Sequence, residues 1–212
     1  MVAAIRQTDY SHIPCIAHCL QLSILAGLKA ADSSPLVAKF RYLVGHFKHS
    51  SANTSELKRS HSSASLPKYD VMFHKLQQDV ATRWNSTYMM LARLLEVKDA
   101  IMQYHIDHPN NYSGSKLTES DWDKMAKYTP VLGSLADATE YVGSEQYATC
   151  SAVLPLEAFL RRLLMVNDDD PGYIARFKTA PLNDFTNRIE GIDALTTLQM
   201  AVALDPRYKK LT

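Results

Sequence analysis

The stretch DVATRWNSTY, residues 79–88, places a large indole ring and a fixed positive charge where an amphipathic helix begins. After it, apolar residues recur at helical spacing opposite a polar side until Pro109 ends the pattern. Two interpretations of this helix entrance follow from the residue types. Trp84 either anchors the helix in a hydrophobic core or stacks on an unpaired base. In the second case Arg83 contacts phosphate, and Asn85 caps the helix or contacts a base edge.

Helical periodicity also dominates the rest of the chain. The predicted helices cover residues 14–31, 34–49, 86–108, 146–166 and 173–189, with a further helix that opens at Thr118 and contains Leu132. A Pro in the first turn opens the first two, and Thr118 with Asp121 has the spacing of a capping box. Pro130 and Pro155 are expected to bend or divide their helices.

Two segments depart from this periodicity. Residues 50–65 hold seven serines and almost nothing apolar, so they are predicted to be a flexible loop. A short alternation at Leu76, Gln78 and Val80 predicts the only strand of the chain. The fold class that these patterns predict is therefore mainly α.

The composition limits the class of protein. With 212 residues, 46% of them hydrophobic, the chain can bury a real core as one large domain or two small ones. Lys plus Arg total 23 against 22 Asp plus Glu, so an attraction to nucleic acid would have to come from local patches. Three Cys do not form the framework of a secreted scaffold, and no apolar run approaches the roughly 20 residues of a membrane span. We therefore expect a soluble intracellular protein with no membrane partner.

One short segment has the residue types of a metal site. Four soft ligands fall within eight residues, namely His12, Cys15, His18 and Cys19. On a helix the last three of them would share one face. A closed zinc site usually draws its ligand pairs from two separate segments, so the preferred interpretation is a buried helix without a metal. Catalysis by a Cys15 nucleophile with His18 lacks a third orienting group.

The acidic run at residues 168–170 lies in a Pro/Gly turn and is predicted to be a solvated loop.

A second basic candidate is LDPRYKK, residues 204–210, in which cations surround one Tyr after an apolar run. Its simplest interpretation is a structured terminus with a solvated basic tail, and phosphate contact is the functional alternative. Arg207, Lys209 and Lys210 are therefore candidate DNA-binding residues, together with the three residues of the RWN segment.

Three separated motifs together resemble one known family. CIAHCLQL (15–22) is similar to the CxxHxLxL segment of the hAT superfamily of DNA transposases and its domesticated relatives, the zinc-finger BED domain proteins. DVATRWNSTYMMLARLLE (79–96) resembles that family's TRWNSTYxML segment, and MAVALDPRYKKL (200–211) resembles its LDPRYK segment. YTPVLGSL and TCSAVLPLEAFL are similar to the sequence between the latter two motifs. Order and spacing agree over nearly the whole chain, with Gln21 in place of the Asn of many members.

The resemblance implies a ribonuclease-H-like catalytic core that is interrupted by a large all-helical insertion. On that scheme residues 1–85 are an incomplete α/β core segment, and residues 86–212 belong to the helical insertion domain. Cys15 and His18 would lie near the family's active site without being metal ligands. The family's Trp that stabilises distorted transposon-end DNA corresponds by motif to Trp84.

The same resemblance bears on catalysis. The family uses two Asp and one Glu with Mg²⁺ or Mn²⁺, and those motif segments have no counterpart between residues 1 and 212. We therefore expect no enzymatic activity, cofactor, metal or small-molecule substrate for this chain. The expected role is residual DNA binding or self-association within a nuclear, transcription-related protein. The alternatives are a protein-interaction module without DNA binding, and a piece of an active transposase whose catalytic residues lie outside this chain.

Overall fold

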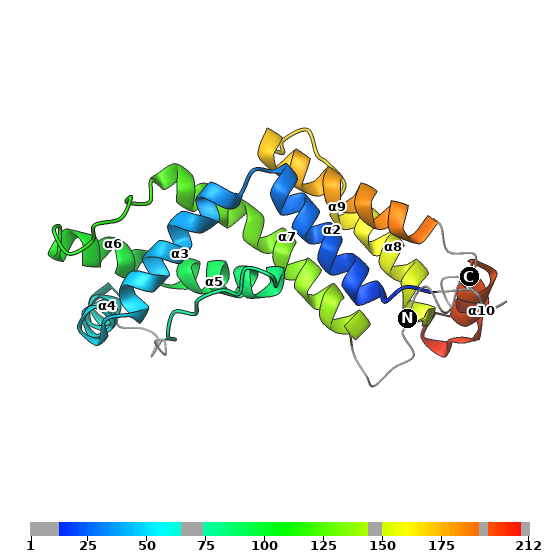
Figure 1. Ribbon diagram of the computed structural model, residues 1–212, viewed down its shortest axis with the longest axis horizontal. Helices are drawn as coiled ribbons and strands as arrows, with labels where there is room; N and C mark the ends of the chain where they lie inside the picture. The colour runs from blue at the N-terminus through cyan, green and yellow to red at the C-terminus, as the bar shows by residue number, and fades with distance from the viewer. Residues whose placement is uncertain (1–12, 65–73, 144–149, 191–194, 209–212) are drawn as a thin grey trace. The chain divides into compact units, whose positions relative to one another are not determined.

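Figure 1 shows the computed structural model, which describes residues 13–64, 74–143, 150–190 and 195–208. The α-helices are α2 (Ile16–Ala30), α3 (Ser34–Lys48), α4 (Ser51–Ala64), α5 (Trp84–Glu96), α6 (Lys98–Asp107), α7 (Glu119–Gly143), α8 (Val153–Leu163), α9 (Gly172–Glu190) and α10 (Leu195–Leu204). Two 3-10 turns, η1 (Cys150–Ala152) and η2 (Pro206–Tyr208), precede α8 and follow α10. The described residues contain no strand, so the mainly α prediction is confirmed and the α/β part of the expected core is not seen.

The chain divides into two compact units. Unit 1 combines the residues up to Asp32 with those from Ser134 onward, and unit 2 comprises residues 33–133. Helix α7 therefore contributes its first part to unit 2 and its last part to unit 1. The expected boundary between family domains at residues 85 and 86 stays a prediction, and both residues lie inside unit 2.

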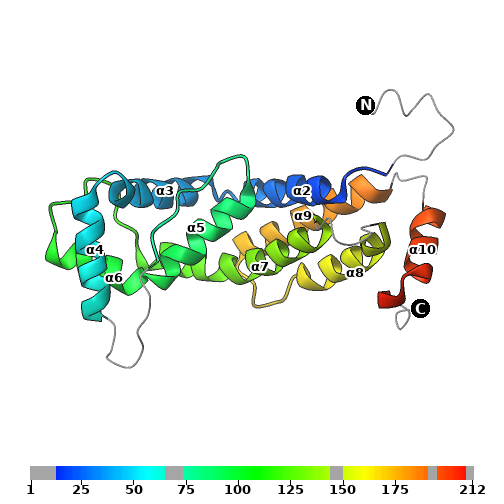
Figure 2. The same cartoon turned by 90° about the horizontal axis from the view of Figure 1, so that it is seen from below.

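In unit 1, α2 and α9 lie side by side (Figure 2). They approach closely because Gly27 has no side chain. A Cβ at this position would overlap the Pro181 ring and would lie 3.0 Å from the carbonyl oxygen of Phe177. A polar contact adds to the packing, since Ser23 Oγ donates to Asp184 Oδ2 at 2.7 Å. The first predicted helix is thus confirmed together with its packing partner.

In unit 2, α3 supplies the apolar stripe that its sequence predicted. Phe40, Leu43 and Phe47 recur at helical spacing and are buried, and the Phe40 ring lies 6.2 Å from the Trp122 ring, centroid to centroid. Helix α4 packs against both α3 and α6. These contacts give unit 2 a core of its own.

The signals for helix starts and stops are mostly confirmed. Thr118 and Asp121 form the predicted capping box. The Thr118 N–H donates to Asp121 Oδ2 at 2.9 Å, and the Asp121 N–H donates to Thr118 Oγ1 at 3.2 Å. The helix predicted from residue 86 is two helices, α5 and α6, which meet at the buried Val97. Pro130 lies inside α7 without ending it. Pro155 lies in the first turn of α8. A backbone N–H at this position makes no hydrogen bond within the helix, so proline costs none. Residues 146–149 of that predicted helix lie outside the described residues.

The flexible loop predicted for residues 50–65 is wrong over Ser51–Ala64, which form α4. Leu57 is fully buried and fixes one side of the helix against the core. The hydroxyls that favoured a loop instead make local bonds. Ser50 Oγ accepts the Asn53 N–H at 3.2 Å, and Thr54 Oγ1 donates to the carbonyl of Phe47 at 2.6 Å.

The predicted strand is also wrong. Residues 76–80 are coil, and Val80 is exposed. An alternation of three residues is too short to distinguish a strand from a segment that is held by side-chain hydrogen bonds, as this one is.

Candidate nucleic-acid interface

The indole of Trp84 lies in the core of unit 2. Trp84 is the first residue of α5 and is only 1% exposed, and its Nε1 has no hydrogen-bond partner in the structure. The structure therefore agrees with the packing interpretation of this residue. In this conformation the ring faces are not accessible to a base, so Trp84 does not contribute to the interface described below.

Asp79 explains much of the motif that precedes the helix. Its side chain is 1% exposed, and both of its oxygens accept hydrogen bonds from the Arg41 guanidinium at 2.7–2.9 Å. Thr87 Oγ1 donates to the same carboxylate at 2.8 Å. Burial raises the pKa of Asp79, but the bonds from Arg41 and Thr87 outweigh it and hold the pKa below its usual value. The carboxylate thus fastens the coil before α5 to both α3 and α5.

Ser86 completes the helix entrance. Its Oγ accepts the Val80 N–H at 2.7 Å and lies within donating distance of the carbonyls of Val80 and Arg83. The Arg83 N–H donates to the Val80 carbonyl at 2.8 Å, which closes a tight turn. Asp79, Trp84, Ser86 and Thr87 therefore have structural roles, and these account for most of the DVATRWNSTY stretch.

Arg83 and Asn85 are the parts of the motif that face outward. Both are exposed, and neither side chain bonds to another residue within the described ranges. A guanidinium in this position can contact a phosphate without breaking an existing ion pair. Arg83 and Asn85, both predicted to bind DNA, are thus free to contact it.

A basic cleft lies in the same unit. Its volume is about 700 Å³, and it is lined by Phe47, Lys48, His49, Ser51, Thr54, Ser55, Leu57, Lys75 and Leu76. Lys48, His49 and Lys75 are exposed, and these lining residues include no carboxylate. Lysines and hydroxyls without an acidic neighbour are suited to phosphate oxygens. Sequence reasoning missed this cleft because the two lysines come from segments that no motif connects.

Arg207 of the LDPRYK motif is engaged inside unit 1. Its Nη2 lies 2.6 Å from Asp205 Oδ2 and 3.2 Å from Ser151 Oγ, and its Nη1 lies 3.3 Å from Tyr141 Oη. The guanidinium also lies 5.5 Å from the centre of the Tyr208 ring. The bonds from Arg207, followed by the one from Ser151, lower the pKa of Asp205. Phosphate contact would require these bonds to break, so the prediction for Arg207 is not supported. Lys209 and Lys210 lie outside the described residues.

The structure describes three of the four residues of the cysteine and histidine segment. Cys15 is the extended N-cap of α2, and both Cys15 and His18 are exposed, whereas Cys19 is buried and burial raises the pKa of its thiol. Of the three residues that were expected to share a helix face, Cys15 thus lies outside α2 and only Cys19 is buried. Among the described residues no group of three His, Cys, Asp or Glu side chains is placed to hold a metal ion, and His12 lies outside them.

Comparison with known proteins fixes the family. A family model described as the ZBED1 RNase-like helical domain matches residues 13–130, which is more than half of the chain. The chain belongs to this hAT-type, BED zinc-finger family. The resemblance drawn from the three motifs is therefore confirmed.

Curated relatives of this hAT-type chain include a transposase and two BED proteins. It is 26% identical to "Putative AC transposase" of Zea mays over 204 residues, covering 95% of this chain and 24% of that protein. It is 31% identical to "Zinc finger BED domain-containing protein 6" of Homo sapiens over 160 residues, covering 74% and 15%. It is 24% identical to "Zinc finger BED domain-containing protein 4" of Homo sapiens over 210 residues, covering 97% and 17%. The chain thus spans a quarter or less of the length of these relatives. No helix among the described residues is long and apolar enough to cross a bilayer.

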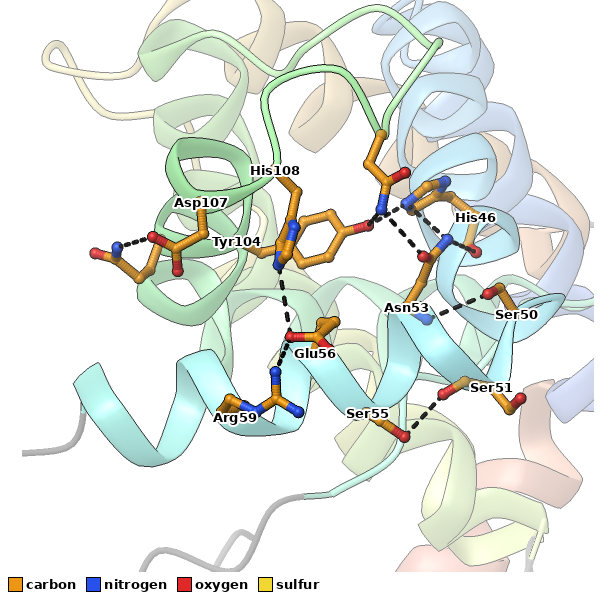
Figure 3. Close-up of polar contacts among 12 residues, drawn as sticks. His46, Ser50, Ser51, Asn53, Ser55, Glu56, Arg59, Tyr104, Asp107 and His108 are labelled. Carbon is orange, nitrogen blue, oxygen red and sulfur yellow. Dashed lines mark hydrogen bonds and ion pairs between the residues drawn. The ribbon is translucent and has the colours of Figure 1, made fainter.

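Within the stretch that matches the family model, a histidine cluster joins α3, α4 and α6 (Figure 3). His46 Nε2 lies 2.9 Å from Tyr104 Oη and 3.2 Å from Asn53 Nδ2. Both neighbours can donate, so this nitrogen is suited to accept as a neutral imidazole. His108 Nε2 lies 3.6 Å from Glu56 Oε2 on the outer side of the cluster.

We expect this cluster to make unit 2 less stable in acid. Burial lowers the pKa of His46. The cluster also includes His105, whose ring lies 5.8 Å from the Tyr104 ring, centroid to centroid, and its pKa is lowered by burial and then by the charges of Lys116 and His46. Because both folded-state values lie below the unfolded value of about 6.5, the stability is present above that pH and is lost as the pH falls through the folded-state values. The urea concentration at the unfolding midpoint should therefore decrease as the pH is lowered from 7.5 to 5.5. The fluorescence of Trp84 and Trp122 measures it.

The matched variants identify the source of this pH dependence. His46→Gln and His105→Gln should each flatten the loss, because neither glutamine takes up a proton. His49→Gln is the control, since this exposed histidine lies outside the cluster. A midpoint that falls equally in all four proteins would contradict the assignment.

Proposed function

We propose that this chain contributes DNA contact, and not catalysis, to a hAT transposase-like, BED-type nuclear protein with a transcription-related role. The observation that carries the proposal is the cleft lined by Lys48, His49 and Lys75, whose described lining residues include no carboxylate. The net charge of the whole chain is only +1, so a local concentration of cations is what a polyanion would recognise. Arg83 and Asn85 supply further outward-facing donors in the same unit.

The non-catalytic part of the proposal rests on chemistry. Two-metal strand transfer needs carboxylates that hold both cations, and the family motifs that carry them have no counterpart in this sequence. A parent protein that holds these motifs elsewhere is compatible with this role. The chain would then contribute the DNA-contacting surface of the larger enzyme.

The lysine pair gives a direct test. A Lys48→Gln/Lys75→Gln double variant should weaken binding of a fluorescent forked duplex, because two phosphate contacts are lost. In a plot of log affinity against log salt, the slope should become shallower by about 2, or about 1 for each lysine. Fluorescence anisotropy between about 50 and 200 mM NaCl measures both quantities.

Lys29→Gln is the matched control, since Lys29 is an exposed lysine of unit 1. It removes one positive charge, against two in the double variant, and should leave the slope nearly unchanged, whereas loss of either cleft lysine should change it by about 1. Equal slopes for the double variant and the unaltered chain, or no measurable affinity at the lowest salt, would remove the DNA proposal.

A further inference from the structure

A groove in unit 1 brings together aromatic side chains from three separate segments of the chain. Its volume is about 540 Å³, and its lining includes Tyr141 of α7, Phe159 of α8 and Tyr208 of η2. This volume lies within the range of about 300–1,000 Å³ that is typical of ligand sites. Tyr141 and Phe159 are each 43% exposed, so the groove opens on the surface and a segment of another molecule can reach it.

Among the residues that the structure describes, the groove lining carries a single charged side chain, and it is acidic. Asp137 lies in the lining and is exposed, and its carboxylate has no ion pair or hydrogen bond with another described residue. The described part of the lining contains no Lys, Arg or His. Arg207 bonds to Tyr141 of the lining, and its charge is compensated by Asp205 at 2.6 Å. The groove therefore offers one unneutralised carboxylate among aromatic rings.

Aromatic rings together with a carboxylate favour a positively charged ligand that also has apolar groups. The negative face of an aromatic ring attracts a cation, most effectively one that is weakly hydrated. The Tyr208 ring already has a guanidinium 5.5 Å from its centre, which is an intramolecular example of this attraction. An uncharged apolar ligand would fill the same space but would bury Asp137 without a partner, at a cost in free energy.

We propose that this groove binds an alkylated ammonium group that is carried on a lysine side chain of another protein chain. Methyl groups on the nitrogen weaken its hydration and match the aromatic lining, and the retained charge pairs with Asp137. The groove is larger than such a head group and opens on the surface, which leaves room for the backbone on either side of the modified lysine. The proposal is independent of the DNA-binding role of unit 2.

The test uses the full chain and an alanine-flanked pentapeptide with a central trimethyl-lysine. The comparison peptide carries the uncharged carbon analogue, in which a tert-butyl group replaces the trimethylammonium group. Amide chemical shifts in ¹H–¹⁵N spectra should give an affinity about tenfold higher for the cationic peptide. Asp137→Asn and Phe159→Ala should each reduce that affinity about fivefold or more, with the shifts concentrated at groove residues.

Met165→Ala is the matched control, because Met165 is an exposed apolar residue of unit 1 outside the groove lining. It should leave the affinity unchanged, and thermal melts of all variants should overlay. Equal affinity for the charged and uncharged peptides, or no binding of either, would overturn the proposal. Free choline binding as tightly as the peptide would overturn the assignment to a protein-borne lysine. The Lys48→Gln/Lys75→Gln variant should bind the peptide normally, so failure here is distinguishable from failure of the DNA proposal.

Discussion

Replacing Trp84 with alanine should lower the free energy of unfolding of unit 2 by about 3–5 kcal/mol. The indole is almost completely buried at the first turn of α5, and its removal would leave a cavity that the surrounding helices can close only in part. Since the chain has two Trp, the variant keeps Trp122 as its single indole, and that residue also lies in unit 2. Urea unfolding followed by Trp122 fluorescence therefore reports on the correct unit.

Two further variants distinguish a packing role of Trp84 from a role in base stacking. Trp84→Phe should cost less than the alanine variant, because it keeps an aromatic ring and removes an indole N–H that has no partner. In a Trp122→Phe background, the emission of Trp84 should be unquenched by a forked duplex. A Trp84→Ala protein that is as stable as the unaltered chain but loses DNA affinity would restore the stacking interpretation.

Local signals were sufficient for most helices of this fold. The stripe of α3, the Ser–Pro pair that opens this helix and the capping box of α7 depend on residues close together in sequence, and each is present in the structure. Helix α4 was missed for a physical reason. Only Leu57 and Ser60 of its described side chains are buried, so the segment has no apolar period to detect, and its serines favour caps and turns in isolation.

The functional surface was harder to predict than the fold. The TRWNST motif correctly indicated the family, but the sequence left open whether Trp84 points inward or outward. The same holds for Arg207, whose partners Tyr141 and Ser151 are distant in sequence. Lys48 and Lys75 line one cleft only after the chain has folded. Trp84 and Arg207 of the motifs thus make structural contacts, Arg83 and Asn85 of the same motifs remain candidate contact residues, and Lys48 and Lys75 lie outside the motifs.

Arg41→Ala should destabilise unit 2 by about 3 kcal/mol at pH 7, and it should cost more than Asp79→Ala. The two ends of this ion pair differ in exposure, since the Asp79 side chain is 1% exposed and that of Arg41 is 35% exposed. Without Arg41, a buried carboxylate loses its main partner and cannot reach water. Without Asp79, the guanidinium can turn outward and be hydrated, so the penalty is smaller. Urea midpoints of the two variants at constant pH measure this asymmetry.

The stability that Asp79 contributes should change in opposite directions in the unaltered chain and in Arg41→Ala as the pH falls. In the unaltered chain the pKa of Asp79 is depressed, so its stabilising contribution is present above about pH 4 and is lost as the pH falls through the folded-state value. In Arg41→Ala, burial is no longer offset and the folded-state pKa of Asp79 should rise above the unfolded value. The folded variant then binds more protons than its unfolded form, and the gap to the unaltered chain should narrow between about pH 6 and 4. A gap that stays constant over this range, or an Asp79→Ala variant that is the less stable of the two, would show that the carboxylate is not held in a charged state by Arg41.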